Sequence, residues 1–121
     1  MTTIANVKVC NIRPKYKNLF EWCNDENNVY IGRKGIVFIN NERYPKNDSI
    51  WCNPYKITKD MNRNDVIKKY KIYIIDKIKK EHLYDNLLKL KGKILGCWCY
   101  PEPCHGDVLI DLINNYDDNF I

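Results

Sequence analysis

The feature that most constrains the fold is the run 93–110, which holds three of the six cysteines and one of the two histidines. Residues 94–99 form a short, largely apolar stretch, which predicts a buried central strand. Pro101 and Pro103 then force an extended turn, because proline cannot donate to a strand ladder. Beyond the turn, apolar residues recur at helical spacing from about His105. The run therefore predicts a strand, a tight turn and a helix.

This arrangement places reactive side chains where α/β proteins bind ligands, because ligand sites lie outside the carboxyl ends of the strands. Cys104 would lie at the helix N-terminus, where the pKa of a thiol is lowered, with His105 beside it in sequence. Asp107 falls in the first turn, where the helix dipole favours a carboxylate. Cys97 and Cys99 are two apart on the strand and share a face. The sequence leaves open which of them reaches the loop.

The rest of the chain predicts further strands and two helices. The longer helix has apolar residues at helical spacing, and Asn62 or Asn64 is its expected N-cap. With the final strand beside the first in the sheet centre, the pattern predicts one small α/β domain over 1–121. Its sheet would be mostly parallel, Rossmann-like and flanked by helices. We expect strands at Val7–Ile12, Asn28–Arg33 and Ile36–Ile39, helices at 63–80 and 81–90, and a frayed acidic tail at 114–121.

Length and charge narrow the class of protein. At 121 residues the chain suits one domain. It has neither a signal-peptide layout nor an apolar run near the ~20 residues of a membrane helix, so we expect a cytoplasmic protein without a membrane partner. All 20 Lys and Arg precede residue 101, whereas five of the 15 acidic residues follow it. This basic body favours a nucleotide or nucleic-acid partner, although a solvated lysine-rich surface explains it equally well.

Three upstream motifs supply candidate substrate-binding residues. The planar fork of Arg33 suits a phosphate or a carboxylate, and Gly32 allows a ligand to approach the backbone closely. Asn53 precedes a proline that fixes its amide, and Trp51 beside it could stack a base. The alternatives are a hairpin turn with a surface arginine, and core aromatics beside an ordinary turn. The full set of binding candidates is Asn11, Arg13, Tyr30, Gly32, Arg33, Trp51 and Asn53.

The run from Leu95 to Leu109 resembles the C-terminal signature of the DUF4326 family. The resemblance continues upstream through 9–13, 29–33 and 49–55, and so covers nearly the whole chain. It implies a small α/β domain of a kind found in cellular organisms and viruses, without a settled function. Two features depart from the family: Cys52 stands where glycine is usual, and residues 34–48 replace a short link. The end of the chain also resembles, faintly, the DUF488 proteins, which carry a cysteine and a Cys-His pair at a similar place.

These observations favour an enzyme that acts on a nucleotide, a nucleoside or a nucleic-acid base. Cys104 or Cys99 would be the nucleophile, or His105 the general base with Asp107 orienting it. Arg33 would hold a phosphate, and the aromatic–amide motif at 51–53 would position the base.

Two alternatives remain open at the level of the sequence. Cys97, Cys99, Cys104 and His105 supply the four ligands that structural zinc needs, although their spacing differs from paired Cys-x2-Cys knuckles. Otherwise the cysteines are small hydrophobic residues of a core strand. Either reading would make the protein a nucleic-acid- or protein-binding module. The sequence specifies no other cofactor and no oligomeric state.

Overall fold

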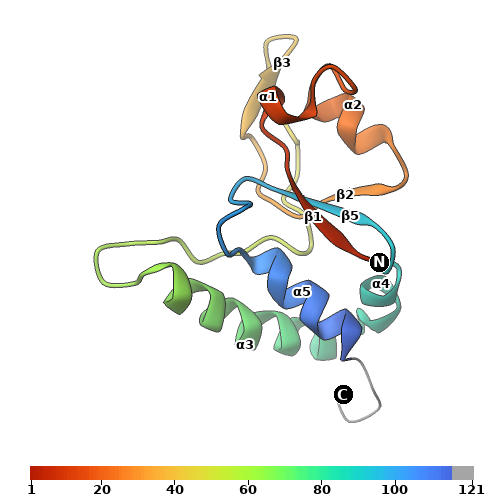
Figure 1. Cartoon of the computed structure of the whole chain (residues 1–121). Helices are drawn as coiled ribbons and strands as arrows, with labels where there is room; N and C mark the ends of the chain where they lie inside the picture. The colour runs from red at the N-terminus through yellow and green to blue at the C-terminus, as the bar shows by residue number, and fades with distance from the viewer. Residues whose placement is uncertain (116–121) are drawn as a thin grey trace.

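The structure, a computed structural model, describes residues 1–115 and is built around three parallel strands (Figure 1). From residue 116 onward, the expected acidic tail lies outside the described residues. Within residues 1–115, no helix combines the length and apolarity needed to cross a bilayer. The strands are β1 (Thr3–Asn6), β2 (Asn28–Tyr30), β3 (Val37–Ile39), β4 (Glu42–Tyr44) and β5 (Ile94–Cys97); the helices are α1 (Val9–Ile12), α2 (Leu19–Asn24), α3 (Arg63–Glu81), α4 (Tyr84–Leu88) and α5 (His105–Asn114).

The central strand is β5, which pairs in parallel with β1 on one side and β2 on the other. Ala5 and Tyr30 both lie opposite Gly96 in the register. The Ile31 N–H extends the β2 ladder by donating to the Gly96 carbonyl at 3.0 Å. The predictions of a small α/β domain with a parallel sheet, and of the last strand beside the first at its centre, are therefore confirmed.

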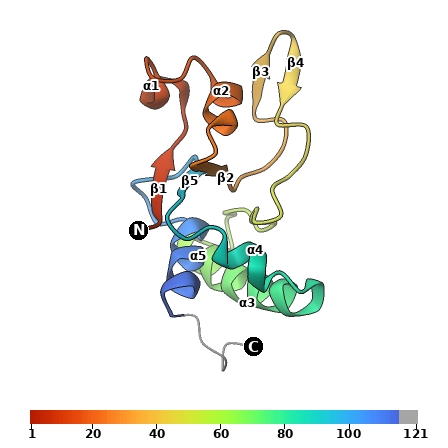
Figure 2. The same ribbon diagram turned by 90° about the vertical axis from the view of Figure 1, so that its right-hand side faces the viewer.

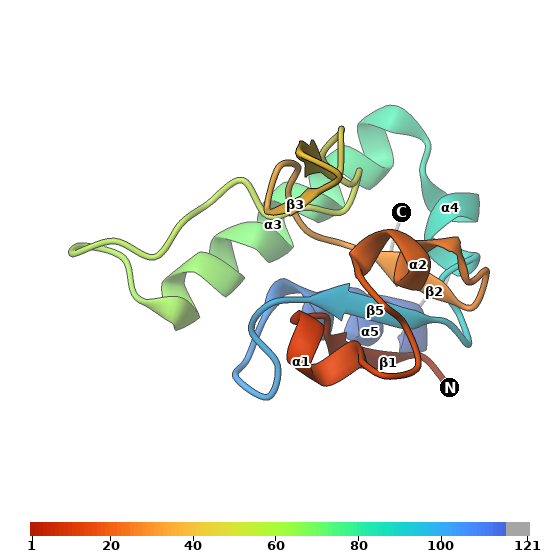
Figure 3. The same ribbon diagram turned by 90° about the horizontal axis from the view of Figure 1, so that it is seen from above.

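Helices cover both faces of this sheet. Helices α3, α4 and α5 lie below it in the standard view, and α1 and α2 lie above it (Figures 1 and 2). Seen from above, α5 passes behind the strands while α1 and α2 lie in front (Figure 3). Side chains of β5 alternate between the two layers, as a strand requires. Leu95 and Cys97 join the larger core with Tyr70, Ile74, Ile78 and Leu109, and Ile94 packs on the smaller core of Val7, Ile12, Leu19 and Trp22.

Gly96 is the point of closest contact between the sheet and α2. The indole of Trp22 lies directly over it. A Cβ atom at this position would stand 2.7 Å from Cζ3 of Trp22 and 2.8 Å from Cγ1 of Val7. Side chains do not tolerate such separations, so only glycine fits here.

The predicted strand at Val7–Ile12 was wrong, because the first strand ends earlier, at Asn6. The Asn6 Oδ1 accepts a hydrogen bond from the Lys8 N–H at 3.0 Å. This local bond turns the chain, since asparagine side chains compete with strand pairing in this way. The alternating residues that follow form α1 instead. The second helix is also shorter than expected and runs only from Tyr84 to Leu88.

The segment 34–48 forms a separate hairpin of β3 and β4. Asn40 and Asn41 make its turn with φ angles of 52° and 67°, which two-residue hairpin loops favour. The hairpin closes at its base, where the Ser49 N–H donates to the Gly32 carbonyl at 3.1 Å. It is therefore an excursion that leaves and rejoins the domain at one place.

Candidate functional site

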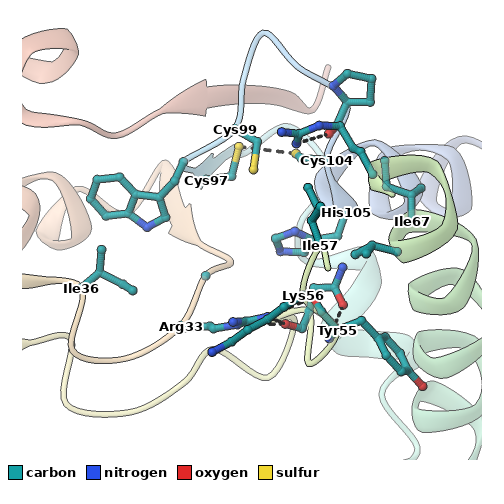
Figure 4. Close-up of a pocket in the computed structure, with 16 residues that line it drawn as sticks. Arg33, Ile36, Tyr55, Lys56, Ile57, Ile67, Cys97, Cys99, Cys104 and His105 are labelled. Carbon is teal, nitrogen blue, oxygen red and sulfur yellow. Dashed lines mark hydrogen bonds between the residues drawn. The ribbon is translucent and has the colours of Figure 1, made fainter. Parts of the chain in front are cut away.

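A cavity of about 530 Å³ lies beyond the carboxyl ends of β2 and β5, between the sheet and the first turns of α3 (Figure 4). This is the edge at which parallel sheets bind ligands. Its walls come from the segments after both strands, from the start of α5 and from the irregular segment before α3. The lining residues are Gly32, Arg33, Ile36, Asn53, Tyr55, Lys56, Ile57, Arg63, Val66, Ile67, Cys97, Trp98, Cys99, Pro103, Cys104 and His105.

The cavity brings together most of the motifs that the sequence singled out. Cys104 and Asn53 come from motifs far apart in the sequence, and both line it. His105 lies between the cysteines and the segment that carries Tyr55 and Lys56 (Figure 4). The candidates that share this one cavity are Gly32, Arg33, Asn53, Cys99, Cys104 and His105.

Two of the cysteines form a buried pair on the cavity wall. The Sγ atoms of Cys97 and Cys104 are 3.4 Å apart, and the two residues are 1% and 3% exposed. The hydrogen bond from the Cys104 thiol, against the opposing effect of burial, lowers the pKa of Cys97 to about 6. The same bond, together with burial, raises the pKa of Cys104 far above its usual value. The hydrogen bond therefore favours ionisation of Cys97 over ionisation of Cys104.

Helix α5 begins on this pair. Cys104 is its N-cap residue, and the Cys104 Sγ accepts the Gly106 N–H at 3.3 Å. Asp107 completes a capping box, because its Oδ2 accepts the Cys104 N–H at 3.0 Å. Asp107 is exposed and does not line the cavity, so its contact in the structure is with the helix end rather than with a reacting group.

His105 is held as a neutral ring with a defined tautomer. Its Nε2 lies 2.6 Å from the Ile31 carbonyl, which only an N–H can satisfy, and its ring packs edge-on against Tyr70. Burial is the main effect on His105 and lowers its pKa. The second ring nitrogen, Nδ1, is consequently unprotonated, and it has no hydrogen-bond partner within residues 1–115. His105 lines the cavity, and its Nδ1 is a proton acceptor without a partner in this part of the chain.

The buried neutral ring predicts a pH dependence of stability. The unfolded chain takes up a proton at His105 near pH 6.5, whereas the folded chain does so only at lower pH. The contribution of this residue is thus complete above about pH 6.5 and is lost as the pH falls toward the folded pKa. We expect urea unfolding to give a smaller difference in free energy between pH 7 and pH 5.5 in His105→Gln, whose Nε2 can still donate to Ile31. Exposed His82 is the control: His82→Asn should keep the full wild-type difference, and an unchanged difference in His105→Gln would contradict the assignment.

Arg33 braces the irregular wall of the cavity. Its Nε and Nη2 donate to the Asn53 carbonyl at 3.0 and 2.7 Å, and Nη2 also donates to the Tyr55 carbonyl at 3.0 Å. The fork that the sequence suggested for a phosphate thus holds the backbone. Nη1 has no such bond within residues 1–115. With Lys56 and Arg63 it gives the lining three cationic groups, and no described lining residue is acidic.

Asn53 presents an amide donor to the cavity. Its Oδ1 accepts the Tyr55 N–H at 2.9 Å, which fixes the side chain in an Asx turn. Its Nδ2 has no hydrogen-bond partner within the described chain, although the residue is only 9% exposed. The Nδ2 atom is not fully buried, so it can donate to water or to a ligand in the cavity.

Four of the predicted binding residues lie outside the cavity. Asn11 and Arg13 are exposed in the opposite layer, and Arg13 Nε donates to the Lys17 carbonyl. Trp51 is 3% exposed within the larger core, where its carbonyl accepts the Tyr70 hydroxyl. Tyr30 links two cavity segments, since its hydroxyl donates to the Arg33 carbonyl at 2.8 Å and accepts the Trp98 Nε1–H at 2.9 Å.

Sequence reasoning missed Lys56 and Arg63 as lining residues. Both stand near the start of α3, in a stretch whose path no periodicity predicts. The Arg63 Nη1 donates to the Pro103 carbonyl at 3.1 Å and so ties α3 to the proline turn. Their nearness in sequence to Asn53 was the only available signal.

The geometry does not favour a zinc site. Among residues 1–115, no three His, Cys, Asp or Glu side chains are placed so that they could hold a metal ion. His105 turns Nε2 to a backbone carbonyl, and Cys104 is occupied as a helix cap. The four residues are close in sequence without forming a tetrahedral set.

Comparison with known proteins places the chain among viral relatives. The profile of DUF4326, described as a domain of unknown function, matches residues 14–115. An uncharacterised protein, R718, of Acanthamoeba polyphaga mimivirus is 36% identical over 100 residues, covering 74% of this chain and 71% of its own. An uncharacterised 12.4 kDa protein from the nrdA-td intergenic region of Enterobacteria phage T4 is 29% identical over 124 residues, covering 99% and 94%. No solved structure matches.

Proposed function

This chain belongs to the DUF4326 family, and we propose that it is an enzyme that processes a nucleotide, a nucleoside or a nucleic-acid base in the cavity beyond β2 and β5. The observation that carries the proposal is the free Nδ1 of neutral His105, which shares one concave wall with the Cys97–Cys104 pair. A proton acceptor and a hydrogen-bonded sulfur pair in one cavity are groups that nucleophilic catalysis uses.

The cavity offers each part of such a substrate a suitable neighbour. The Asn53 Nδ2 would donate to a ring nitrogen or carbonyl of a base, and the apolar wall would cover the ring. Lys56, Arg63 and the Arg33 Nη1 would attract a phosphate, because no described acidic residue opposes them in the lining. A sulfur atom would add to an electron-poor ring carbon of the base, so that a C–S bond forms, a ring C=N bond opens and its electron pair moves to the ring nitrogen, while His105 takes up the thiol proton.

Cys99 stays a second candidate for the nucleophile. It lines the cavity and is less buried than Cys97 and Cys104, so a substrate would reach its sulfur more easily. It lacks the thiol partner that lowers the pKa of Cys97. The pair is therefore the stronger choice.

A binding module without a metal is the alternative function. The three cationic groups of the cavity, and the exposed lysines of α3, would suit a single nucleic-acid strand as well as a free nucleotide. The length of the ligand distinguishes the two functions. An enzyme pocket should bind a single nucleotide, whereas a binding module should need a longer strand.

Ligand-dependent thermal stability tests the proposal. We expect nucleoside monophosphates to raise Tm by mass action and the matching nucleosides to raise it less, because only the former engage the cations. Lys56→Ala should weaken nucleotide binding by about tenfold, in line with the loss of one charge-assisted contact. Lys68→Ala, on an exposed part of α3 outside the cavity, is the matched control.

The outcomes of this screen are distinct. Equal weakening by both lysine variants would indicate general electrostatic attraction and count against the cavity. Stabilisation that appears only with DNA or RNA strands would favour the binding module.

A further inference from the structure

The paired cysteines have a geometry that neither substrate binding nor helix capping requires. Their Sγ atoms are 3.4 Å apart, and a disulfide needs about 2.05 Å. Cys97 ends β5, and Cys104 stands at the other end of a short proline-containing loop, with an extended rather than helical backbone. Formation of the disulfide therefore requires a small movement of Cys104 at the end of the loop rather than a displacement of the sheet.

We propose that Cys97 and Cys104 form a redox-active dithiol, which a peroxide converts reversibly to an intramolecular disulfide in the wall of the cavity. The cavity gives a small oxidant access to sulfur atoms that are otherwise buried. This inference does not depend on the proposed enzymatic function.

Each step of the oxidation balances. The Cys97 sulfur attacks one oxygen of hydrogen peroxide, so that an S–O bond forms, the O–O bond breaks and the departing oxygen leaves as water after protonation. The resulting sulfenic acid is attacked by the Cys104 sulfur, which forms the S–S bond and releases a second water. Two thiols thus lose two electrons and two protons, and the peroxide is reduced to two waters. An external dithiol reverses the reaction by exchange.

The Cys97–Cys104 pair differs from the remaining cysteines in its contacts, so oxidation should be selective for the pair. Cys99 lines the same cavity but is not hydrogen-bonded to another sulfur, and Cys10, Cys23 and Cys52 are likewise free thiols. Burial raises the pKa of Cys23 and Cys52, which slows their reaction with an oxidant. The hydrogen-bonded pair should oxidise first.

Limited oxidation of the full-length reduced protein tests this. After treatment with one equivalent of hydrogen peroxide, we expect the protein to lose about 2 Da of mass, and subsequent alkylation under denaturing conditions to label two fewer than its six cysteines. Peptide mapping should find a Cys97–Cys104 link, and dithiothreitol should restore both thiols. Cys97→Ser and Cys104→Ser should each abolish the link, whereas Cys99→Ser should retain it.

Folding of the variants does not limit the test. Serine is itself a favoured N-cap, so Cys104→Ser should retain α5, as far-ultraviolet circular dichroism would show. If a variant fails to fold, the peptide map of the wild-type protein decides on its own. A link between any other pair, a peroxide product without a link, or loss of the link in Cys99→Ser would overturn the proposal.

Discussion

His105→Gln is expected to lower turnover by about 10²–10⁴-fold while nucleotide binding stays within about threefold, because general-base catalysis is typically worth that factor. Glutamine can keep the donor that His105 directs at the Ile31 carbonyl at 2.6 Å, but it offers no basic nitrogen in place of Nδ1. The change in turnover is measured by mass spectrometry, as the decrease in product formed from a nucleotide that stabilises the protein. The thermal shift caused by the same nucleotide measures the change in binding.

A matched variant makes this result specific. His82 is exposed and ends α3 with a φ angle of 55°, far in sequence from the cavity segments. His82→Asn should turn over substrate at the wild-type rate. If His105→Gln also turned over at that rate, the proton acceptor would have to be sought elsewhere.

Gly96→Ala is expected to lower the free energy of unfolding by about 3 kcal/mol or more, at the upper end of overpacking effects. The new methyl group would overlap the indole of Trp22 and approach Cγ1 of Val7 to 2.8 Å. The backbone cannot retreat, because β5 is hydrogen-bonded to strands on both sides. Urea unfolding measures the change, which is a large share of the 5–15 kcal/mol typical of a domain.

Two comparisons isolate the cause of that effect. At Gly106, the nearest neighbours of an added Cβ are the flexible δ-methyl groups of Ile31 and Ile4, at 3.0 and 3.1 Å. Gly106→Ala should therefore cost far less. Trp22→Leu should recover part of the loss in the Gly96→Ala background; if the two changes were simply additive, the overlap would not be its origin.

Those parts of the fold that depend on local patterns were predictable from the sequence. The apolar spacing of α3 and the asparagine before it gave its bounds closely, and Asn62 proved to be the N-cap. The central place of β5 followed from its apolar character. The first strand was misplaced because one side-chain hydrogen bond, from Lys8 to Asn6, overrides the alternation that follows.

The site was less predictable, because its key contacts are long-range. The sequence identified Arg33 as a candidate for binding a phosphate or a carboxylate, but nothing local shows that its fork holds the carbonyl of Asn53, twenty positions away. Trp51 looks in sequence like a stacking platform, yet the fold buries it in the core. The pairing of Cys97 with Cys104 depends on how the proline turn bends, which spacing alone does not determine.

The hairpin at 34–48 separates two kinds of change in this protein. Because Ser49 closes onto Gly32 at its base, the hairpin beyond Ile36, which still lines the cavity, can lengthen, shorten or alter its surface without moving the strands of the sheet. His105 is meanwhile held by Ile31, whose N–H bonds to Gly96 in the central strand and whose carbonyl bonds to the His105 ring. Substitutions and insertions in the hairpin can thus change which partners its outer surface contacts, while the arrangement of the parallel sheet and of His105 stays the same.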